Sequence, residues 1–164
     1  MKRNNGLTTL VLIALATFVV SMPPSAHARQ CSLAKAAGTY GFTATGALLP
    51  PTGPVPVAAV GSITLNADGS LSGTEARSIG GDFANETLGP GTWMINPDCT
   101  GTLTAKVFES GVLVRTSVLS FVADDNIRQI RVVQQSLTVP DGTPNGTNVP
   151  AVITFEGRRI FDQD

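Results

Sequence analysis

Glu75, Arg77 and Arg115 are the residues whose types and positions could form a binding site in this chain of 164 residues. Two guanidinium groups that face one interior could together hold a carboxylate or a phosphate through paired hydrogen bonds. Trp93, the only tryptophan, could stack on the same ligand, while its alternation with Ile95 also fits core packing. The alternative for the three charged residues is that they pair with one another at the rim of the fold. No catalytic residue, metal site or cofactor is predicted.

The expected register of the strands places these charged side chains on one face. A loop of three residues, Ala67–Gly69, has glycine in the left-handed position and pairs Leu65 with Leu71. Continuing this register by strict alternation puts Glu75 and Arg77 on the same face as Leu65, toward the far end of the hairpin.

A second three-residue loop, Glu109–Gly111, gives the corresponding prediction for Arg115. It pairs Val107 with Leu113 and therefore Ala105 with Arg115, which places the arginine in the core-facing phase. A β-bulge in this hairpin would shift the pairing. Without a bulge, the three charged residues share one interior.

Eight segments between turn-forming residues show the alternation of apolar and polar side chains that is typical of β-strands. No stretch after residue 38 has the period of an amphipathic helix, and only Ser32–Ala37 could form a helical turn. The run Gly89–Gly91 predicts a bulge or bend within the fourth segment. The expected strands are Thr39–Leu48, Val57–Asn66, Ser70–Ser78, Phe83–Asn96, Thr102–Phe108, Val112–Ala123, Ile127–Val139 and Ala151–Phe161.

Short connections between these segments favour an eight-stranded antiparallel up-and-down β-barrel, with a β-sandwich as the alternative. In such a barrel the two long, proline-rich loops, Leu49–Pro56 and Pro140–Pro150, lie at the same end. Three short turns lie at the opposite end, together with Cys99 and the start of the first strand. The long loops would therefore surround the mouth of the barrel.

The first 28 residues have the features of a secretory signal peptide. Basic residues precede the apolar run Leu7–Val20, and Ala26-His27-Ala28 fits a cleavage site. The apolar run is too short to cross a bilayer, so we expect no membrane association after cleavage. We expect a signal peptide at 1–28, an N-terminal segment at 29–37 and one barrel domain at 38–164, exported by a bacterium to the periplasm or beyond.

The composition of the mature chain excludes several classes of protein. Its only histidine, His27, leaves with the signal peptide, which removes histidine-based catalytic triads and histidine-ligated zinc. Nine basic residues then stand against twelve acidic ones, and no basic stripe with interleaved aromatic residues indicates nucleic acid as a partner. The acidic turns lack the ligand spacing of a calcium loop, and no glycine-rich phosphate loop precedes a helix.

Cys31 and Cys99 are the two cysteines of the chain, and an even number in an exported protein predicts a disulfide. The bond would close a loop of 68 residues. On the chain-entropy model such a loop stabilises the fold by roughly 4 kcal/mol. It would also tie the N-terminal segment to the short-turn end of the barrel.

Two features at the ends of the barrel domain resemble the calycin pattern of lipocalins and avidins. Gly38-Thr39-Tyr40 opens the first strand, and Arg158 and Arg159 stand near the end of the last one. In calycins an aromatic side chain at this place, usually tryptophan, packs under an arginine at the closed end of the barrel. The resemblance implies an eight-stranded barrel that binds a small molecule in its mouth. The chain is also similar to small secreted bacterial β-barrels without an assigned activity.

We therefore expect a secreted, non-enzymatic β-barrel that binds a small, partly apolar molecule, with an anionic group of the ligand on Arg77 and Arg115. One alternative is a protein-binding module, such as a periplasmic protease inhibitor, that works through Leu49–Pro56, Pro140–Pro150 or the N-terminal segment Arg29–Ala37. A weaker alternative is a cofactor-free cyclase or isomerase. In that case Glu75 would serve as acid or base, because the mature chain has no histidine.

Overall fold

The computed structural model describes residues 30–160, and the predicted signal peptide therefore lies outside the described residues. The chain is all-β apart from the short helix α1 (Leu33–Ala36) and a 3-10 turn, η1 (Asp125–Ile127). The predicted helical turn and the eight predicted strands are confirmed, and each strand end lies within two residues of its expected position. The strands are β1 (Gly38–Leu48), β2 (Val55–Leu65), β3 (Ser70–Ile79), β4 (Asp82–Ile95), β5 (Thr100–Glu109), β6 (Val112–Asp124), β7 (Gln129–Val139), β8 (Thr147–Asn148) and β9 (Ala151–Arg159).

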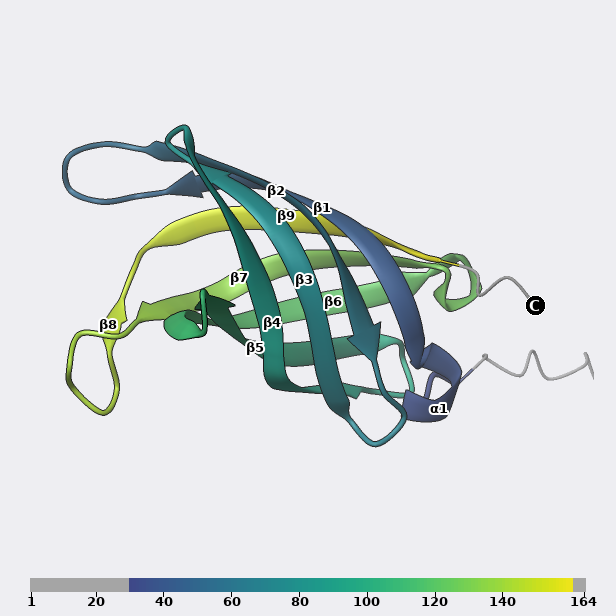
Figure 1. Cartoon of the computed structure of the whole chain (residues 1–164). Helices are drawn as coiled ribbons and strands as arrows, with labels where there is room; N and C mark the ends of the chain where they lie inside the picture. The colour runs from purple at the N-terminus through teal and green to yellow at the C-terminus, as the bar shows by residue number, and fades with distance from the viewer. Residues whose placement is uncertain (1–29, 161–164) are drawn as a thin grey trace, which may run out of the picture.

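Eight of these strands close into an antiparallel barrel (Figure 1). Strands β1 to β6 pair in sequence order, β6 pairs with β7, β7 with β9, and β9 returns to β1. The two-residue strand β8 only extends the edge of β7. The predicted up-and-down barrel is confirmed, and the sandwich alternative is excluded because the pairings form one closed ring. Among the described residues, no helix is long and apolar enough to cross a membrane.

The two ends of the barrel differ as the loop lengths predict. The long connections after β1 and β7 lie together at one end, where the Leu49 N–H donates to Pro150 O at 2.8 Å. At the opposite end α1 lies beside the short β2–β3 and β4–β5 turns (Figure 1). We call the first the loop end and the second the helix end.

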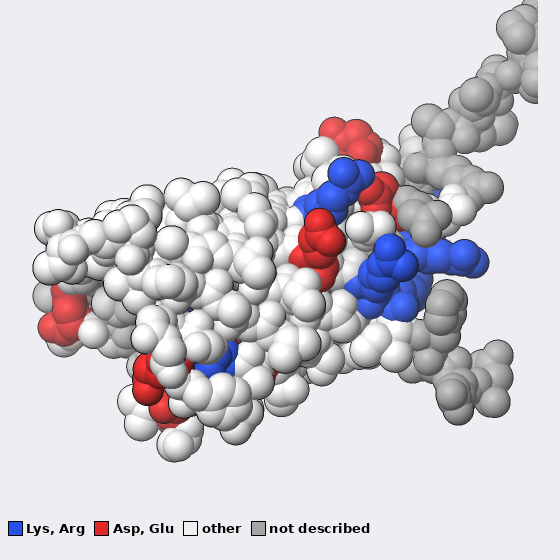
Figure 2. Space-filling model, turned by 90° about the horizontal axis from the view of Figure 1, so that it is seen from above, with Lys and Arg blue, Asp and Glu red and all other residues white. Residues whose placement is uncertain are grey.

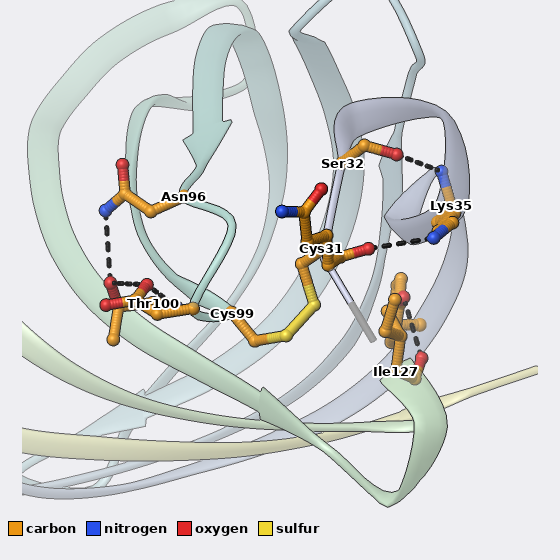
Figure 3. Close-up of a disulfide and its surroundings, with 10 residues drawn as sticks. Cys31, Ser32, Lys35, Asn96, Cys99, Thr100 and Ile127 are labelled. Atoms are coloured by element: carbon orange, nitrogen blue, oxygen red, sulfur yellow. Dashed lines mark hydrogen bonds between the residues drawn. A yellow bond between two sulfur atoms is a disulfide. The ribbon is translucent and has the colours of Figure 1, made fainter. Parts of the chain in front are cut away.

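A disulfide ties the N-terminal segment to the helix end. Cys31 and Cys99 are bonded across a sequence separation of 68 residues, which confirms the predicted pair (Figure 3). The Cys31 N–H also donates to Pro97 O at 3.1 Å. In the same turn Asn96 Nδ2 donates to Thr100 Oγ1 at 3.0 Å, which helps to fix the connection between β4 and β5. A disulfide of this kind is typical of a non-reducing, exported compartment.

Tyr40 closes the helix end of the barrel. Its side chain is fully buried, and its hydroxyl lies 2.9 Å from Ala36 O and 3.1 Å from Ile127 O. The Arg159 guanidinium lies over the tyrosine ring, 6.0 Å from the ring centroid, and donates to Lys35 O at 3.3 Å. The aromatic ring under an arginine that the calycin resemblance implies is therefore present. The contacts of Tyr40 and Arg159 join the first strand, the last strand and α1.

Replacing Tyr40 with phenylalanine tests this junction. The change keeps the ring and removes the hydroxyl, so the buried Ala36 carbonyl and the Ile127 carbonyl lose a donor. We expect the free energy of unfolding to fall by about 1–2 kcal/mol. Urea unfolding followed by tryptophan fluorescence measures the difference. A Tyr40→Phe protein as stable as the parent would show that the hydroxyl makes no net contribution.

The predicted register of the β5–β6 hairpin is wrong. Arg115 lies opposite Val107 rather than Ala105, and Leu113 lies opposite Phe108 rather than Val107. The turn has two residues and not the predicted three, because Glu109 pairs with Val112, and this shifts the ladder by one residue. A β-bulge between Val107 and Phe108 shifts it by one more. Beyond the bulge the pairing is displaced by two residues along β6, and a shift of two preserves the phase. Arg115 therefore still faces the interior.

The interior is packed at the helix end and hollow toward the loop end. Buried apolar side chains that do not line the cavity fill the helix end. They include Tyr40, Leu65, Leu71, Trp93, Phe121 and Ala123. One face of the outer wall carries few charges over the middle of the barrel (Figure 2). Figure 2 shows uncharged side chains over most of the middle of the barrel, with Lys, Arg, Asp and Glu lying toward its ends. Charged side chains that are buried inside the barrel must be paired, because burying a lone charge is costly.

Candidate functional site

A cavity of about 270 Å³ occupies the half of the barrel nearer the loop end. Most of its wall is aliphatic or aromatic, and includes Phe42, Ala59, Leu88, Val107, Val132 and Phe155. The charged side chains of the wall come from four neighbouring strands, β3 to β6, and are Glu75, Arg77, Glu86, Glu109 and Arg115. The cavity is thus apolar over most of its surface and polar on one side.

Glu75 lies in the middle of this polar side. The predicted β2–β3 register is confirmed, and it places Glu75 opposite Gly61. On its other side Glu75 lies directly opposite Glu86 of β4. A Cβ atom at Gly61 would come within 2.8 Å of Phe42 Cζ and 2.3 Å of Thr74 O. The glycine therefore leaves room for an aromatic ring beside the carboxyl group.

Glu86 connects the charged residues into one cluster. Its side chain has no exposed surface, its Oε1 accepts from Arg77 Nε at 3.0 Å, and its Oε2 lies 2.7 Å from Arg115 Nη1. Arg115 also donates through Nη2 to Glu75 Oε1. We did not single out Glu86 from the sequence. The signal was present, because Ala84, Glu86 and Leu88 alternate on the buried face of β4.

Arg77 extends the cluster toward the loop end. Its Nη1 lies 2.7 Å from Asp82 Oδ2, and its Nη2 lies 3.1 Å from Glu109 Oε2. These two carboxylates are at the rim, with 78% and 40% of their side-chain surface exposed. Carboxylates thus contact the guanidinium groups of both Arg77 and Arg115. The charged residues therefore pair with one another, as in the alternative interpretation, but Glu75 and Glu86 do so inside the barrel and not at its rim.

Trp93 lies away from this site. Its ring is buried in the core of the helix end, and its Nε1 donates to Asn66 O at 2.9 Å. It does not line the cavity, so the structure brings together three of the four predicted binding residues. The fourth, Trp93, links β4 to the start of the β2–β3 turn.

The acidic turn residues are engaged within their own turns. Asp68 Oδ1 accepts from the Ser70 hydroxyl at 2.6 Å and from the Ser70 N–H at 2.8 Å. Asp98 Oδ1 accepts likewise from the Thr100 hydroxyl at 2.7 Å and from the Thr100 N–H at 3.0 Å. These hydrogen bonds hold the pKa values of both carboxyl groups below their usual range. Within residues 30–160, no three His, Cys, Asp or Glu side chains are placed to hold a metal ion.

The protonation of Glu75 is the main chemical property of the site. Burial raises the pKa of Glu75 to about 7; the Arg115 guanidinium opposes this rise, and the Glu86 carboxylate adds to it. A carboxyl group with such a pKa can hold or release a proton near neutral pH. The free protein therefore changes the charge of its cavity wall in this range.

This raised pKa predicts a pH dependence of stability. The folded protein binds the Glu75 proton more tightly than the unfolded chain does, so the contribution is fully present below about pH 4.5 and is lost as the pH rises toward about 7. Relative to Glu75→Gln, the parent should lose on the order of 2 kcal/mol between these pH values. Urea unfolding of both proteins across this range measures the difference in their free energies of unfolding. The other titrating groups are the same in both proteins, so their contributions cancel in this difference. A constant difference would contradict a raised pKa.

Comparison of the chain with known protein families, with curated proteins and with solved structures finds no match. The fold and the site therefore define the class of protein. It is a closed eight-stranded β-barrel with a disulfide at one end and a partly hollow lumen at the other.

Proposed function

We propose that this protein is an exported, non-enzymatic carrier that binds a small, mostly apolar molecule in the lumen of its barrel. The observation that carries the proposal is the cavity of about 270 Å³, whose wall is largely aliphatic and aromatic. A concave, mostly apolar site with a few converging polar groups is the usual form of a small-molecule site. Protein interiors are normally close-packed, so a hollow half-barrel supports a role for the space.

The closed end supports the same proposal. Tyr40 under Arg159 reproduces the arrangement for which the chain resembles calycins. Calycin-like barrels are closed at this end and take their ligands from the other. Here the cavity likewise extends toward the loop end, where Leu48 and Val149 belong to its lining.

The charged wall narrows the choice of ligand. An anionic group would have to displace a carboxylate from Arg77 or Arg115, and removing one partner of a buried ion pair is costly. We therefore retain the small apolar ligand expected from the sequence and omit its anionic group. The polar side of the cavity then serves to orient the ligand.

A matched pair of substitutions tests the proposal. Ala59 lines the cavity, whereas its neighbour Ala58 is exposed on the outer wall. Isothermal titration with 1-naphthylmethanol, a neutral apolar probe, should show binding to the parent and to Ala58→Phe. Ala59→Phe should bind at least about tenfold more weakly, a loss of about 1.4 kcal/mol. Thermal unfolding confirms that both variants are folded. No binding by the parent, or equal binding by both variants, would contradict a lumen site.

Exposed apolar residues at the loop end favour a second candidate, a protein partner such as a protease. Leu49, Phe83 and Val112 lie in or beside the connections at that end, and 40%, 65% and 66% of their respective surfaces are exposed. A panel of purified serine and cysteine proteases tests this candidate. Inhibition by the parent that is lost when residues 140–150 are replaced by a short glycine-serine linker would support it. The absence of inhibition across the panel would count against it.

A further inference from the structure

We propose that the ligand of the lumen is a hydrophobic amine, held with its ammonium group against Glu75 and Glu86. This inference rests on the proposed function and specifies the chemical class of its ligand. It reverses the charge expected from the sequence, because the structure shows how the two arginines are used. Three features support it: the charge balance of the wall, an unsatisfied acceptor, and the position of Glu75.

The first feature is an excess of carboxylates on the polar wall. The positive side chains that line the cavity are Arg77 and Arg115. Three carboxylates line the cavity with them, those of Glu75, Glu86 and Glu109, and Asp82 contacts Arg77 from the rim. An anion finds no guanidinium without a carboxylate partner on this wall, whereas a cation would offset part of the excess negative charge. A mouth with two partly exposed carboxylates also attracts cations from solution.

The second feature is a buried acceptor that lacks a donor. Among the described residues, Glu86 Oε2 and Asp124 Oδ1 are the buried side-chain oxygens that accept no hydrogen bond. Glu86 Oε2 lies 2.7 Å from Arg115 Nη1, an ion-pair contact without hydrogen-bond geometry. Buried polar atoms normally have a partner. Glu86 lines the cavity, and an ammonium group supplies three donors and no acceptor.

The third feature is the position of Glu75 between unlike charges. The charged groups around it are Arg77 on its own strand, Glu86 on β4, and Arg115 on β6, which donates to its Oε1. Gly61 of β2 brings no charge to its other side. Burial and Glu86 raise the pKa of Glu75 despite Arg115, so the free protein favours a proton at this place. An ammonium group beside Glu75 would replace that proton.

The rest of the cavity fits the apolar body of such a ligand. Phe42 and Phe155 lie with their ring centroids 6.1 Å apart, and both line the cavity together with aliphatic side chains from β1, β2, β7 and β9. A volume of about 270 Å³ suits a compact body such as one fused-ring system. The ligand class is therefore an amine on a small hydrocarbon or aromatic frame.

Three naphthalene probes of matched size test the charge preference: 1-naphthylmethylamine, 1-naphthylmethanol and 1-naphthoate. At about pH 8, where Glu75 is ionised, we expect the amine to bind roughly tenfold more tightly than the alcohol, and the carboxylate to bind most weakly. At about pH 5.5 the amine should lose most of this advantage, because its ammonium group must then compete with the Glu75 proton. Isothermal titration measures all three affinities.

Two variants separate the site from general electrostatics. Glu75→Gln keeps the shape of the side chain and should reduce the preference for the amine to less than about threefold at either pH. Glu156→Gln removes a carboxylate that is exposed on the outer wall of β9 and should retain the full preference. A loss in both variants would indicate attraction by net charge alone and would overturn the inference.

The results also distinguish this inference from the proposed function. If the alcohol binds the parent as tightly as the amine does at about pH 8, the lumen is still a binding site, and only the amine inference fails. If the carboxylate binds most tightly, the inference is likewise wrong, and the arginines exchange partners on binding. If none of the probes binds, both the carrier function and the amine inference are contradicted.

Discussion

Arg115→Met is expected to lower the free energy of unfolding by about 3–5 kcal/mol at about pH 8. Arg115 contacts both Glu75 and Glu86, whose side chains are 4% and 0% exposed. Methionine replaces the apolar stem of the arginine and carries no charge, so it leaves two buried carboxylates with Arg77 as their remaining cation. The cost should be smaller at about pH 5.5, because Glu75 can then take up a proton. Urea unfolding at the two pH values measures both effects.

Arg131→Met is the matched control. Arg131, like Arg115, forms an ion pair with a carboxylate, in this case that of Asp124. However, 60% of the Arg131 side chain is exposed, on the outside of the barrel. An exposed pair contributes little, so we expect a loss of less than about 1 kcal/mol. If Arg115→Met costs no more than Arg131→Met, the interior cluster is not desolvated in the way the structure shows.

The double substitution Cys31→Ser, Cys99→Ser is expected to have an effect of similar size. The bond joins residues 68 positions apart, so its loss restores a long stretch of freedom to the unfolded chain. The chain-entropy model gives a loss of about 4 kcal/mol, which is an upper figure for a loop of this length. Thermal and urea unfolding of the variant, beside the parent with and without dithiothreitol, measure it.

The barrel itself should survive the loss of the disulfide. The ring of strand pairings does not include Cys31, and Cys99 belongs to a turn. We therefore expect the far-UV circular dichroism of the variant to match the parent under native conditions. The parent in the presence of dithiothreitol should have the same free energy of unfolding as the variant. A loss below about 1 kcal/mol would contradict the role assigned to the bond.

The barrel was predictable because local signals agreed with one another along the chain. Alternation gave the strands, and the aspartate-glycine turn after β2 fixed the register of Glu75 correctly. Because successive connections of an up-and-down barrel alternate between its two ends, both long loops were then assigned to the same end. The two cysteines agreed with this assignment, because the chain enters β1 at the end that holds Cys99.

The β5–β6 register was not predictable from the same signals. Glycines and a proline at 89–91 mark the irregular part of β4, where the pairing with both neighbours is interrupted. The bulge between Val107 and Phe108 has no such mark, because both residues are ordinary strand formers. Only the complete ring of pairings determines where β6 accommodates the extra residue.

The sequence predicts which side chains of the site face the interior, but not which residues they contact. Alternation shows which face a side chain occupies, so Glu75, Arg77 and Arg115 were expected inside. It does not show depth along the barrel axis, which is why Trp93 was grouped with residues of the other half. The pairing of each arginine depends on Glu86 and on strands far apart in sequence. The charge balance of the wall therefore required the structure.

The central claim is that the loop-end half of the barrel is a binding site and not packed core. A methyl NMR titration of the mature protein with 1-naphthylmethanol tests it most directly. We predict shifts for methyl groups that line the lumen, at Val57, Leu88, Val107, Val132 and Ile153. Methyl groups on the outer wall, at Val60, Val122 and Val152, should not move. Shifts confined to the outer wall, or no shifts at a saturating concentration of the probe, would contradict the claim.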